Sequence, residues 1–190
     1  RYDIVGIGSL TCTIKQAYAL ADHLRQQGKK VVIGGPHATF MPEEALKHCD
    51  YVVTKEGELS FPALVEALVN GGQPELVPGV AYRGPGGEIC FGPEAVPADY
   101  ASLPSPDFLL SPQVKAGQVP PIIVTSRGCP HNCNFCSVTA MFGRRYRFKS
   151  NEQVIAELRP VLDRSICFGD DNFCANRSRT KSLLRDLIAQ

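Results

Sequence analysis

Short apolar runs alternate with helical patterns along the first seventy residues. The apolar runs lie at residues 2–7, 31–33 and 51–53, and between them apolar side chains recur every three or four positions. The short runs predict strands, and the recurrence predicts helices with one buried face. This order predicts three strand-to-helix units, and hence a doubly wound parallel sheet of the α/β class.

The sequence also marks helix boundaries and a candidate site. The first helix has an apolar face from Ala17 to Leu24 and a glycine stop at Gly28. The helix after the third strand is predicted to begin with Ser60 as its N-cap and Pro62 in its first turn. Ligands bind at the carboxyl ends of strands in such sheets, so the loops that leave these strands are the candidate site.

Residues 73–120 are richer in glycine and proline than the segments on either side. Two apolar runs, 80–82 and 89–91, flank a Gly-Pro-Gly-Gly loop and predict a hairpin. Residues 97–106 predict an extended linker. We therefore expect this segment to connect a first domain at 1–72 to a second at 121–190.

A second alternation of strand and helix begins at Pro121. Residues 122–125 and 166–168 predict strands, and between them Ser150 and Gln153 predict a capping box at the start of a helix. Pro160 predicts the end of that helix or a kink. The pattern is the opening of a repeated (β/α) architecture.

Composition narrows the class of protein. The chain has 190 residues, 44% hydrophobic and 21% charged, with net charge +1, as in an ordinary globular protein. No apolar run approaches the roughly 18 residues of a membrane span, and no signal peptide is visible. Residues 1–120 carry net charge −4 and residues 121–190 net charge +5. The near-neutral total disfavours nucleic-acid binding by the whole chain, and we expect a cytoplasmic protein.

The eight cysteines are unevenly distributed, because three of them lie at Cys129, Cys133 and Cys136. Such crowding suggests metal chemistry in a reducing compartment rather than a disulfide scaffold. Three thiolates on a four-iron cluster leave one iron free to bind a cofactor. The alternative is structural zinc with His131 or Cys174 as fourth ligand, although His131 lies inside the cysteine loop, a strained position for that role.

The cysteine spacing, Cys-x3-Cys-x2-Cys, resembles that of the radical S-adenosylmethionine (SAM) enzymes. The preceding residues 125–130 (Thr-Ser-Arg-Gly-Cys-Pro) and the aromatic Phe135 extend the similarity. The resemblance implies that the three cysteines bind a [4Fe-4S] cluster and that SAM chelates its fourth iron and is cleaved to a 5′-deoxyadenosyl radical. It also implies SAM contacts at four positions: Phe135, Gly169, Asp170 and Asp171.

The first domain resembles the cobalamin-binding domains that precede the radical SAM barrel in one branch of that superfamily. The similarity lies in residues 3–9, 31–37, 42–45 and 56–58, and it implies a Rossmann-like sheet. The residues that the resemblance assigns to cobalamin are Ser9, Thr11, Gly34, Gly35, His37, Glu56 and Gly57. Taken alone, the Gly-Gly and Ser loops are also typical of plain turns.

One departure concerns cobalt. The chain lacks the Asp-x-His-x-x-Gly string whose histidine ligates cobalt in domains of the methionine-synthase type. Either that loop lies upstream of Arg1, or cobalt has no histidine ligand here. Some relatives keep the domain without the vitamin.

The second half is most similar to the hopanoid-methylating and uncharacterised members of this branch, through residues 142–150 and 170–176. The implied reaction is methyl transfer to, or oxidation of, an unactivated carbon of a small-molecule or lipid-like substrate, with an electron donor such as flavodoxin or ferredoxin. The basic, aromatic run at 142–149 also allows a tRNA-modifying relative, but a solvated loop is favoured because so short a patch makes few phosphate contacts. The remaining five cysteines are expected to be small buried hydrophobes.

Length adds a final expectation. A (β/α)8 barrel needs about 200 residues, and only residues 121–190 are available for it here. We therefore expect the chain to be part of a longer enzyme that lacks the first unit of its cobalamin domain and most of its barrel. Such a piece is not expected to turn over, and formation of 5′-deoxyadenosine by it would overturn that expectation.

Overall fold

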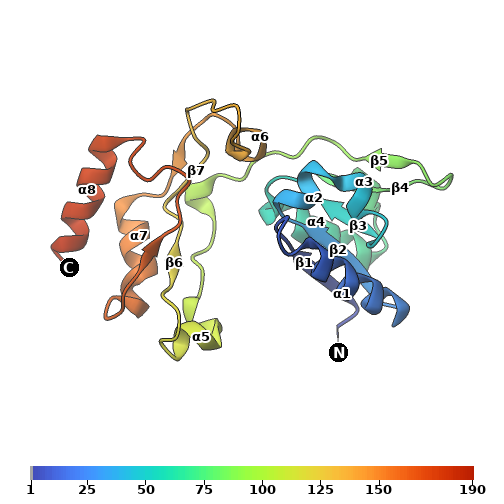
Figure 1. Ribbon diagram of the computed structural model, residues 1–190, viewed down its shortest axis with the longest axis horizontal. Helices are drawn as coiled ribbons and strands as arrows, with labels where there is room; N and C mark the ends of the chain where they lie inside the picture. Colours follow the sequence, from blue (N-terminus) through green and yellow to red (C-terminus); the bar gives the residue numbers. More distant parts are fainter. Residues whose placement is uncertain (1) are drawn as a thin grey trace. The chain divides into compact units, whose positions relative to one another are not determined.

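The computed structural model describes residues 2–190, which form two compact units (Figure 1). The first unit extends to Ala98 and the second begins at Asp99. The boundary differs from the expected three segments, because the hairpin expected to be part of the connecting segment belongs to the sheet of the first unit.

The first unit is built on a five-stranded sheet with the order β1-β2-β3-β4-β5. Its strands are β1 (Ile4–Gly8), β2 (Lys30–Gly34), β3 (Tyr51–Val53), β4 (Val80–Arg83) and β5 (Ile89–Phe91). The first three are parallel, whereas β4 and β5 are antiparallel, so the sheet is mixed. Gly8 pairs with Gly34, and Gly34 with Val53, so the carboxyl ends of the parallel strands are in register at one edge.

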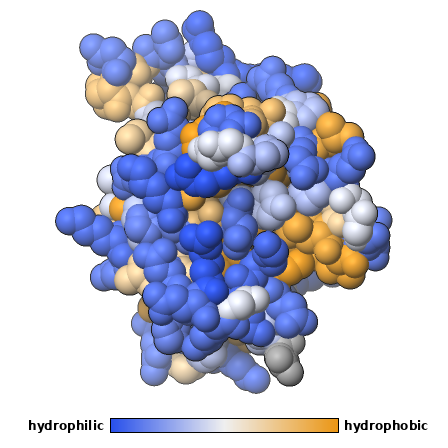
Figure 2. All heavy atoms as spheres, turned by 90° about the vertical axis from the view of Figure 1, so that its right-hand side faces the viewer, coloured by the Kyte–Doolittle hydropathy of each residue, from blue (hydrophilic) through white to orange (hydrophobic). Residues whose placement is uncertain are grey.

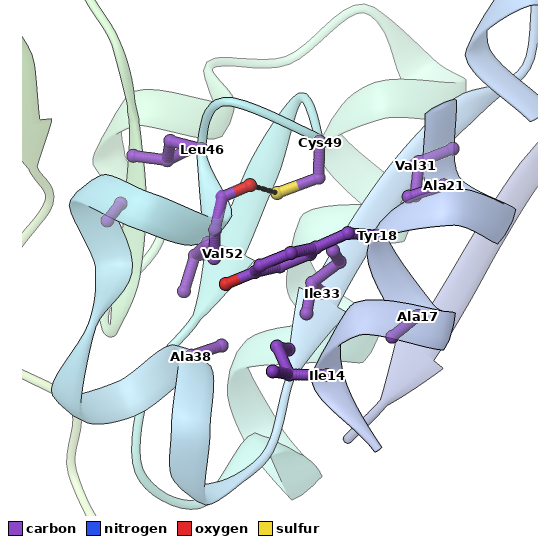
Figure 3. Packing of buried hydrophobic residues seen from close by; sticks show 12 residues of the cluster. Ile14, Ala17, Tyr18, Ala21, Val31, Ile33, Ala38, Leu46, Cys49 and Val52 are labelled. Carbon is purple, nitrogen blue, oxygen red and sulfur yellow. Dashed lines mark hydrogen bonds between the residues drawn. The ribbon is translucent and has the colours of Figure 1, made fainter. Parts of the chain in front are cut away.

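Helices cover both faces of this sheet, as the doubly wound prediction requires. They are α1 (Ile14–Gln26), α2 (Pro36–Phe40), α3 (Pro42–Ala45) and α4 (Gly57–Asn70), with a 3-10 turn η1 (Pro74–Leu76). Val31 and Ile33 pack toward α1, α2 and α3, whereas Val32 between them packs toward α4. Because successive side chains of a strand point to opposite faces, an all-apolar strand supplies two cores. Figure 3 shows the first of these cores around Tyr18 and Ile33.

The start of α4 differs from the sequence prediction. The helix begins at Gly57, so Ser60 lies within it and is buried rather than acting as N-cap. Pro62 lies inside the helix, where it lacks the amide that the Glu58 carbonyl would otherwise accept. The early start brings the first turn of α4 next to the end of β3.

The second unit contains two short sheets. β6 (Ile122–Ile123) pairs in parallel with β9 (Cys167–Phe168), and β7 (Ser126–Arg127) pairs antiparallel with β8 (Arg147–Phe148). Its helices are α5 (Pro112–Lys115), α6 (Val138–Phe142), α7 (Asn151–Leu158) and α8 (Arg177–Ile188). Three 3-10 turns complete it: η2 (Tyr100–Ser102), η3 (Phe108–Leu110) and η4 (Arg159–Val161).

The strand and helix order of the second unit follows the predicted alternation. Ser150 and Gln153 form the predicted capping box, and α7 ends before Pro160. One apolar core joins β6 to α7 and α8 through Ile123, Leu158 and Leu183. Residues 2–190 contain no closed barrel, because β6 and β9 are the only parallel strands that the structure describes in this unit.

In the described part of the chain, no helix combines the length and the apolar character needed to cross a bilayer. The face drawn in Figure 2 is mostly hydrophilic, with smaller apolar areas between the polar ones.

Candidate functional site

The first candidate site is a cavity of about 380 Å³ at the carboxyl ends of the three parallel strands. It lies between this edge of the sheet and the first turns of α4. The residues that line it are Gly6, Ile7, Gly8, Val32, Gly34, Gly35, Val53, Lys55, Gly57 and Phe61. Five glycines in this lining leave space where side chains would otherwise fill the cavity, so a bulky, largely apolar ligand fits it.

Two of these glycines are required by close contacts. A Cβ atom on Gly6 would lie 2.8 Å from Cζ of Phe61, so the Phe61 ring packs directly on the backbone of β1. Gly35 has φ +96°, and a Cβ atom there would lie 2.7 Å from the carbonyl oxygen of Ser9. Glycine therefore sets both the wall and the rim of the cavity.

Thr39 connects two of the lining loops. Its hydroxyl donates a 2.9 Å hydrogen bond to the Gly35 carbonyl and accepts a 2.8 Å hydrogen bond from the Lys55 amide. Lys55 has φ +56° and is the only described non-glycine residue with a positive φ. A left-handed lysine is costly, so the Thr39 hydrogen bond helps to hold this backbone in place.

The residues expected to bind cobalamin separate into two groups. Gly34, Gly35 and Gly57 line the cavity. The residues that do not line it are Ser9, Thr11, His37 and Glu56. Their side chains cannot be identified from spacing as cavity residues, because strand-exit loops can turn either toward α4 or toward the opposite face.

His37 is held on the opposite side of this edge. Its Nδ1 lies 3.2 Å from the Thr11 hydroxyl, and its Nε2 lies 3.6 Å from a carboxylate oxygen of Glu44. The Ser9 hydroxyl lies 3.0 Å from that of Thr13. The contact between His37 and Thr11 therefore connects the loops after β1 and β2, whereas Ser9 and Thr13 both lie in the segment after β1.

Sequence reasoning missed Lys55 and the role of Phe61 in the cavity. Lys55 follows β3 within two residues, and that position was the available signal, because residues just past a parallel strand reach the ligand edge.

The second candidate site is the cysteine loop between β7 and α6 of the second unit. Cys129, Cys133 and Cys136 are free thiols, of which Cys133 is exposed and the other two are half-buried. The Cys136 amide donates to the Cys133 carbonyl at 3.1 Å, which forms a turn between them. Among residues 2–190, no three His, Cys, Asp or Glu side chains are gathered closely enough to hold a metal ion.

The donor set nevertheless fits an iron–sulfur cluster chemically, because three unoxidised thiols lie within one eight-residue loop. The start of this loop is fixed by Gly128, whose φ is +84° and whose missing Cβ would collide with the Arg145 carbonyl oxygen. Asn172 Nδ2 lies 4.0 Å from Cys129 Sγ and can donate to a thiolate there. The loop is thus held in place at Cys129, whereas Cys133 is exposed to solvent.

The other five cysteines do not share one environment. Cys49 is buried as expected, and desolvation raises its pKa to about 12. Cys90 is half-buried, and the expectation of burial is wrong for the three exposed cysteines, which are Cys12, Cys167 and Cys174. They lie in a loop, on the two-residue strand β9 and in the turn after it, where the main chain alone gives little cover.

The residues expected to meet SAM also have separate roles. Asp170 is already engaged, because its carboxylate accepts hydrogen bonds from the Thr125 amide at 3.1 Å, the Thr125 hydroxyl at 2.8 Å and the Ser126 hydroxyl. Asp171 is exposed, and desolvation, followed by the negative charge of Asp170, raises its pKa. Phe135 is 88% exposed. Asp171 and Phe135 therefore remain open to a ligand.

Arg179 completes the hydrogen-bonded group around Thr125. Its guanidinium donates to the Thr125 hydroxyl at 2.8 Å and to the Thr125 carbonyl at 3.2 Å, and burial lowers the pKa of this arginine. Gly169 lies against Ile122, where a Cβ atom would come within 2.7 Å of the isoleucine methyl carbon Cγ2. The exit of β9 is thereby fixed to β6.

The basic run at 142–149 is not a uniformly solvated loop. Lys149 is buried, and its Nζ lies 2.5 Å from Oε1 of the equally buried Glu157. The Tyr100 ring lies 5.1 Å from Lys149 Nζ and 4.7 Å from the Arg127 guanidinium carbon. Lys149 is therefore part of the interior of this unit rather than of a nucleic-acid surface.

Comparison with known proteins identifies a domain family and several relatives. The B12 binding domain family matches residues 1–65. An uncharacterized methyltransferase of Pyrococcus horikoshii is 39% identical over 93% of this chain and 41% of its own length. Hopanoid C-3 methylase of Methylococcus capsulatus is 32% identical over 73% of this chain and 28% of its own length. The chain spans less than half the length of these relatives.

A solved structure shows the same fold. OxsB, a cobalamin-dependent SAM radical enzyme solved with aqua-cobalamin and SAM bound, matches 98% of this chain and 28% of its own chain, with a TM-score of 0.82 and 21% identity. The five-stranded unit is thus a Rossmann-like domain of the cobalamin-binding type. The chain thus contains a B12-binding domain at residues 1–65, shares the fold of OxsB, and is similar in sequence to a methyltransferase and a hopanoid methylase that are both longer than itself.

Proposed function

We propose that this chain supplies the cobalamin site and the cluster site of a radical SAM enzyme that methylates or oxidises an unactivated carbon. The observation that carries the proposal is the presence, in one chain, of a B12-binding domain and a loop with three free thiols spaced Cys-x3-Cys-x2-Cys. The branch of radical SAM enzymes that the sequence resembles combines a B12-binding domain with such a cysteine loop, so the presence of both in one chain supports a shared function.

Cys129, Cys133 and Cys136 bind three irons of a [4Fe-4S] cluster in this proposal. When bound, the cluster supplies the electron that cleaves SAM reductively to a 5′-deoxyadenosyl radical. Gly128 sets the turn that presents Cys129, and Asn172 donates a hydrogen bond toward its sulfur. Hydrogen bonds to thiolates are one of the means by which proteins set cluster potentials.

The open side chains beside the loop bind SAM. Phe135 is exposed next to Cys136 and offers an aromatic face and adjacent backbone to the adenine. Asp171 offers a carboxylate to an ammonium or a ribose hydroxyl. Asp170 acts differently, because its hydrogen bonds with Thr125 and Ser126 hold the segment that follows β9 in position.

The cavity at the edge of the first sheet receives the nucleotide tail of cobalamin, which when bound supplies a transferable methyl group or a redox-active cobalt. Gly34, Gly35 and Gly57 let the ligand approach the backbone closely. His37 contacts Thr11 and Glu44 rather than the cavity. In this arrangement His37 is therefore not among the residues that would hold the nucleotide tail.

The substrate is proposed to be a small molecule or a lipid-like compound, and an electron donor such as flavodoxin or ferredoxin is proposed to reduce the cluster. Support comes from the relatives, which include a hopanoid C-3 methylase and a bacteriochlorophyllide d C-8(2)-methyltransferase. Both names describe methylation at a numbered carbon of an organic compound.

Anaerobic reconstitution with iron and sulfide tests the cluster. We expect a brown protein with about four irons per chain, charge-transfer absorbance and a paramagnetic signal on reduction. Colourless protein with about one zinc per chain would instead support a structural zinc loop and contradict the proposal.

A matched control separates these cysteines from the others. The triple variant Cys129→Ala, Cys133→Ala, Cys136→Ala is expected to lose the iron. A control variant also removes three thiols, all from exposed cysteines, and is expected to keep the iron: Cys12→Ala, Cys167→Ala, Cys174→Ala. Equal iron loss in both variants would contradict the assignment.

A further inference from the structure

The cavity of the first unit has an uneven charge. Glycines, aliphatic residues and Phe61 form most of its lining, and among the described lining residues Lys55 carries the only ionised side chain. Glu56 and Glu58 flank the first residue of α4, but neither of them lines the cavity. An anionic group that enters this cavity therefore meets one cation and no carboxylate in its lining.

The position of Lys55 is fixed by its backbone rather than by its side chain. Its left-handed conformation, with φ +56°, is held by the 2.8 Å hydrogen bond from its amide to the Thr39 hydroxyl. Thr39 also holds Gly35 on the facing loop. The Cα atom of this lysine is thus fixed at the rim, and its long, flexible side chain can reach more than one partner from there.

The ion pair that Lys55 forms with Glu94 is weak. Its Nζ lies 3.1 Å from Oε1 of Glu94, but Lys55 is 40% exposed and Glu94 is 84% exposed in their side chains. Exposed ion pairs of this kind contribute little to stability because water screens them and the side chains lose freedom. An anion in the cavity can therefore replace Glu94 as the partner of the Lys55 ammonium group at little cost.

We infer that Lys55 is a specificity-determining residue that recognises the phosphate of a corrinoid nucleotide tail, with Glu94 as its competitor when the cavity is empty. The inference rests on the proposed corrinoid site and adds the group that selects among corrinoids. Corrinoids with a phosphate in the tail are preferred over those that lack it.

Corrinoids that differ in the tail test this directly. The whole 190-residue chain is titrated with three corrinoids, and the absorbance of the corrin reports binding. Hydroxocobalamin has the complete nucleotide tail, cobinamide lacks the phosphate and the nucleoside, and cobinamide phosphate has the phosphate alone. We expect the chain to bind cobinamide phosphate about tenfold more tightly than cobinamide, because a charge-assisted hydrogen bond is of that strength. Lys55→Met is expected to abolish that preference and leave cobinamide binding unchanged.

Two further variants complete the design. Lys15→Met removes the same charge from an exposed position on α1 and is expected to keep the preference. Glu94→Gln removes the competitor and is expected to increase it. Circular dichroism of each variant checks that it has folded.

The outcomes are distinct. Equal binding of the two cobinamides by the unaltered chain overturns the inference, as does a Lys55→Met variant that weakens both alike while remaining folded. Failure of the unaltered chain to bind any of the three corrinoids overturns the proposed corrinoid site and this inference with it.

Discussion

The Asp170 carboxylate accepts hydrogen bonds from both the amide and the hydroxyl of Thr125, across 45 positions of sequence. Thr125 is fully buried and follows β6, whereas Asp170 follows β9. The pair therefore joins the exits of two parallel strands, at the point where the sequence pattern had suggested a ligand.

Asp170→Asn is expected to destabilise the second unit. The substitution weakens charge-assisted hydrogen bonds to buried donors, so we expect a loss of about 1–3 kcal/mol in the free energy of unfolding. Urea unfolding measures it. Asp171→Asn, at the exposed neighbour, is the matched control and should change stability by less than about 0.5 kcal/mol; equal losses would show that the hydrogen bonds of Asp170 are not what stabilises the loop.

Gly6→Ala is expected to close part of the cavity. The new methyl group would lie 2.8 Å from Cζ of Phe61 and would push the ring away from β1. Hydroxocobalamin titration is expected to show weaker binding. Adding Phe61→Leu, which removes the contacting ring atoms, is expected to recover part of that binding; an unchanged affinity of Gly6→Ala would place the ligand elsewhere.

Thr39→Val is expected to loosen the rim of the cavity. Valine has nearly the same shape but loses the hydrogen bonds to Gly35 and Lys55. We expect about 1–2 kcal/mol lower stability and weaker corrinoid binding, since the left-handed Lys55 loses its support. Thr11→Val, which removes only the contact with His37, is the control. A Thr39→Val protein with full stability and affinity would contradict the role of this hydroxyl.

The buried pair of Lys149 and Glu157 predicts strongly non-additive variants. Lys149→Met alone leaves a buried carboxylate without its cation, and a cost of about 3–5 kcal/mol is expected. The double variant with Glu157→Leu removes both charges and is expected to recover most of that loss. Thermal or urea unfolding of the three variants gives the coupling energy, and additive losses would argue against a tight ion pair.

Cys49 is expected to be unreactive in the folded protein. Burial raises its pKa to about 12, so almost no thiolate exists at neutral pH. In brief alkylation read by mass spectrometry, Cys12 should be modified and Cys49 protected. Because the folded state favours the protonated thiol, its contribution to stability is present below the unfolded pKa near 8.5 and is lost as pH rises from there toward 12. Cys49→Ala should reduce that alkaline loss, and rapid alkylation of Cys49 in folded protein would refute its burial.

The sequence alone determined the order of elements. Apolar runs and helical periodicity identified β1, β2, β3 and the helices between them, and the capping box at Ser150 located the start of α7, because these signals depend on neighbours in sequence. The cysteine spacing was visible for the same reason. Ser60 was misplaced because a serine before an apolar run is typical of an N-cap, whereas in the structure the helix already begins at Gly57.

Tertiary structure decided what each loop residue contacts. The resemblance to cobalamin-binding domains pointed to Gly34, Gly35 and Gly57, which line the cavity. The sequence could not show that His37 lies beside Glu44, that Lys55 and Phe61 line the cavity, or that Asp170 binds Thr125. It also could not show that the hairpin of β4 and β5 extends the sheet, or that Lys149 is buried against Glu157. These outcomes depend on packing between residues distant in sequence, and the side of a loop on which a side chain lies is settled only when the layers close around it.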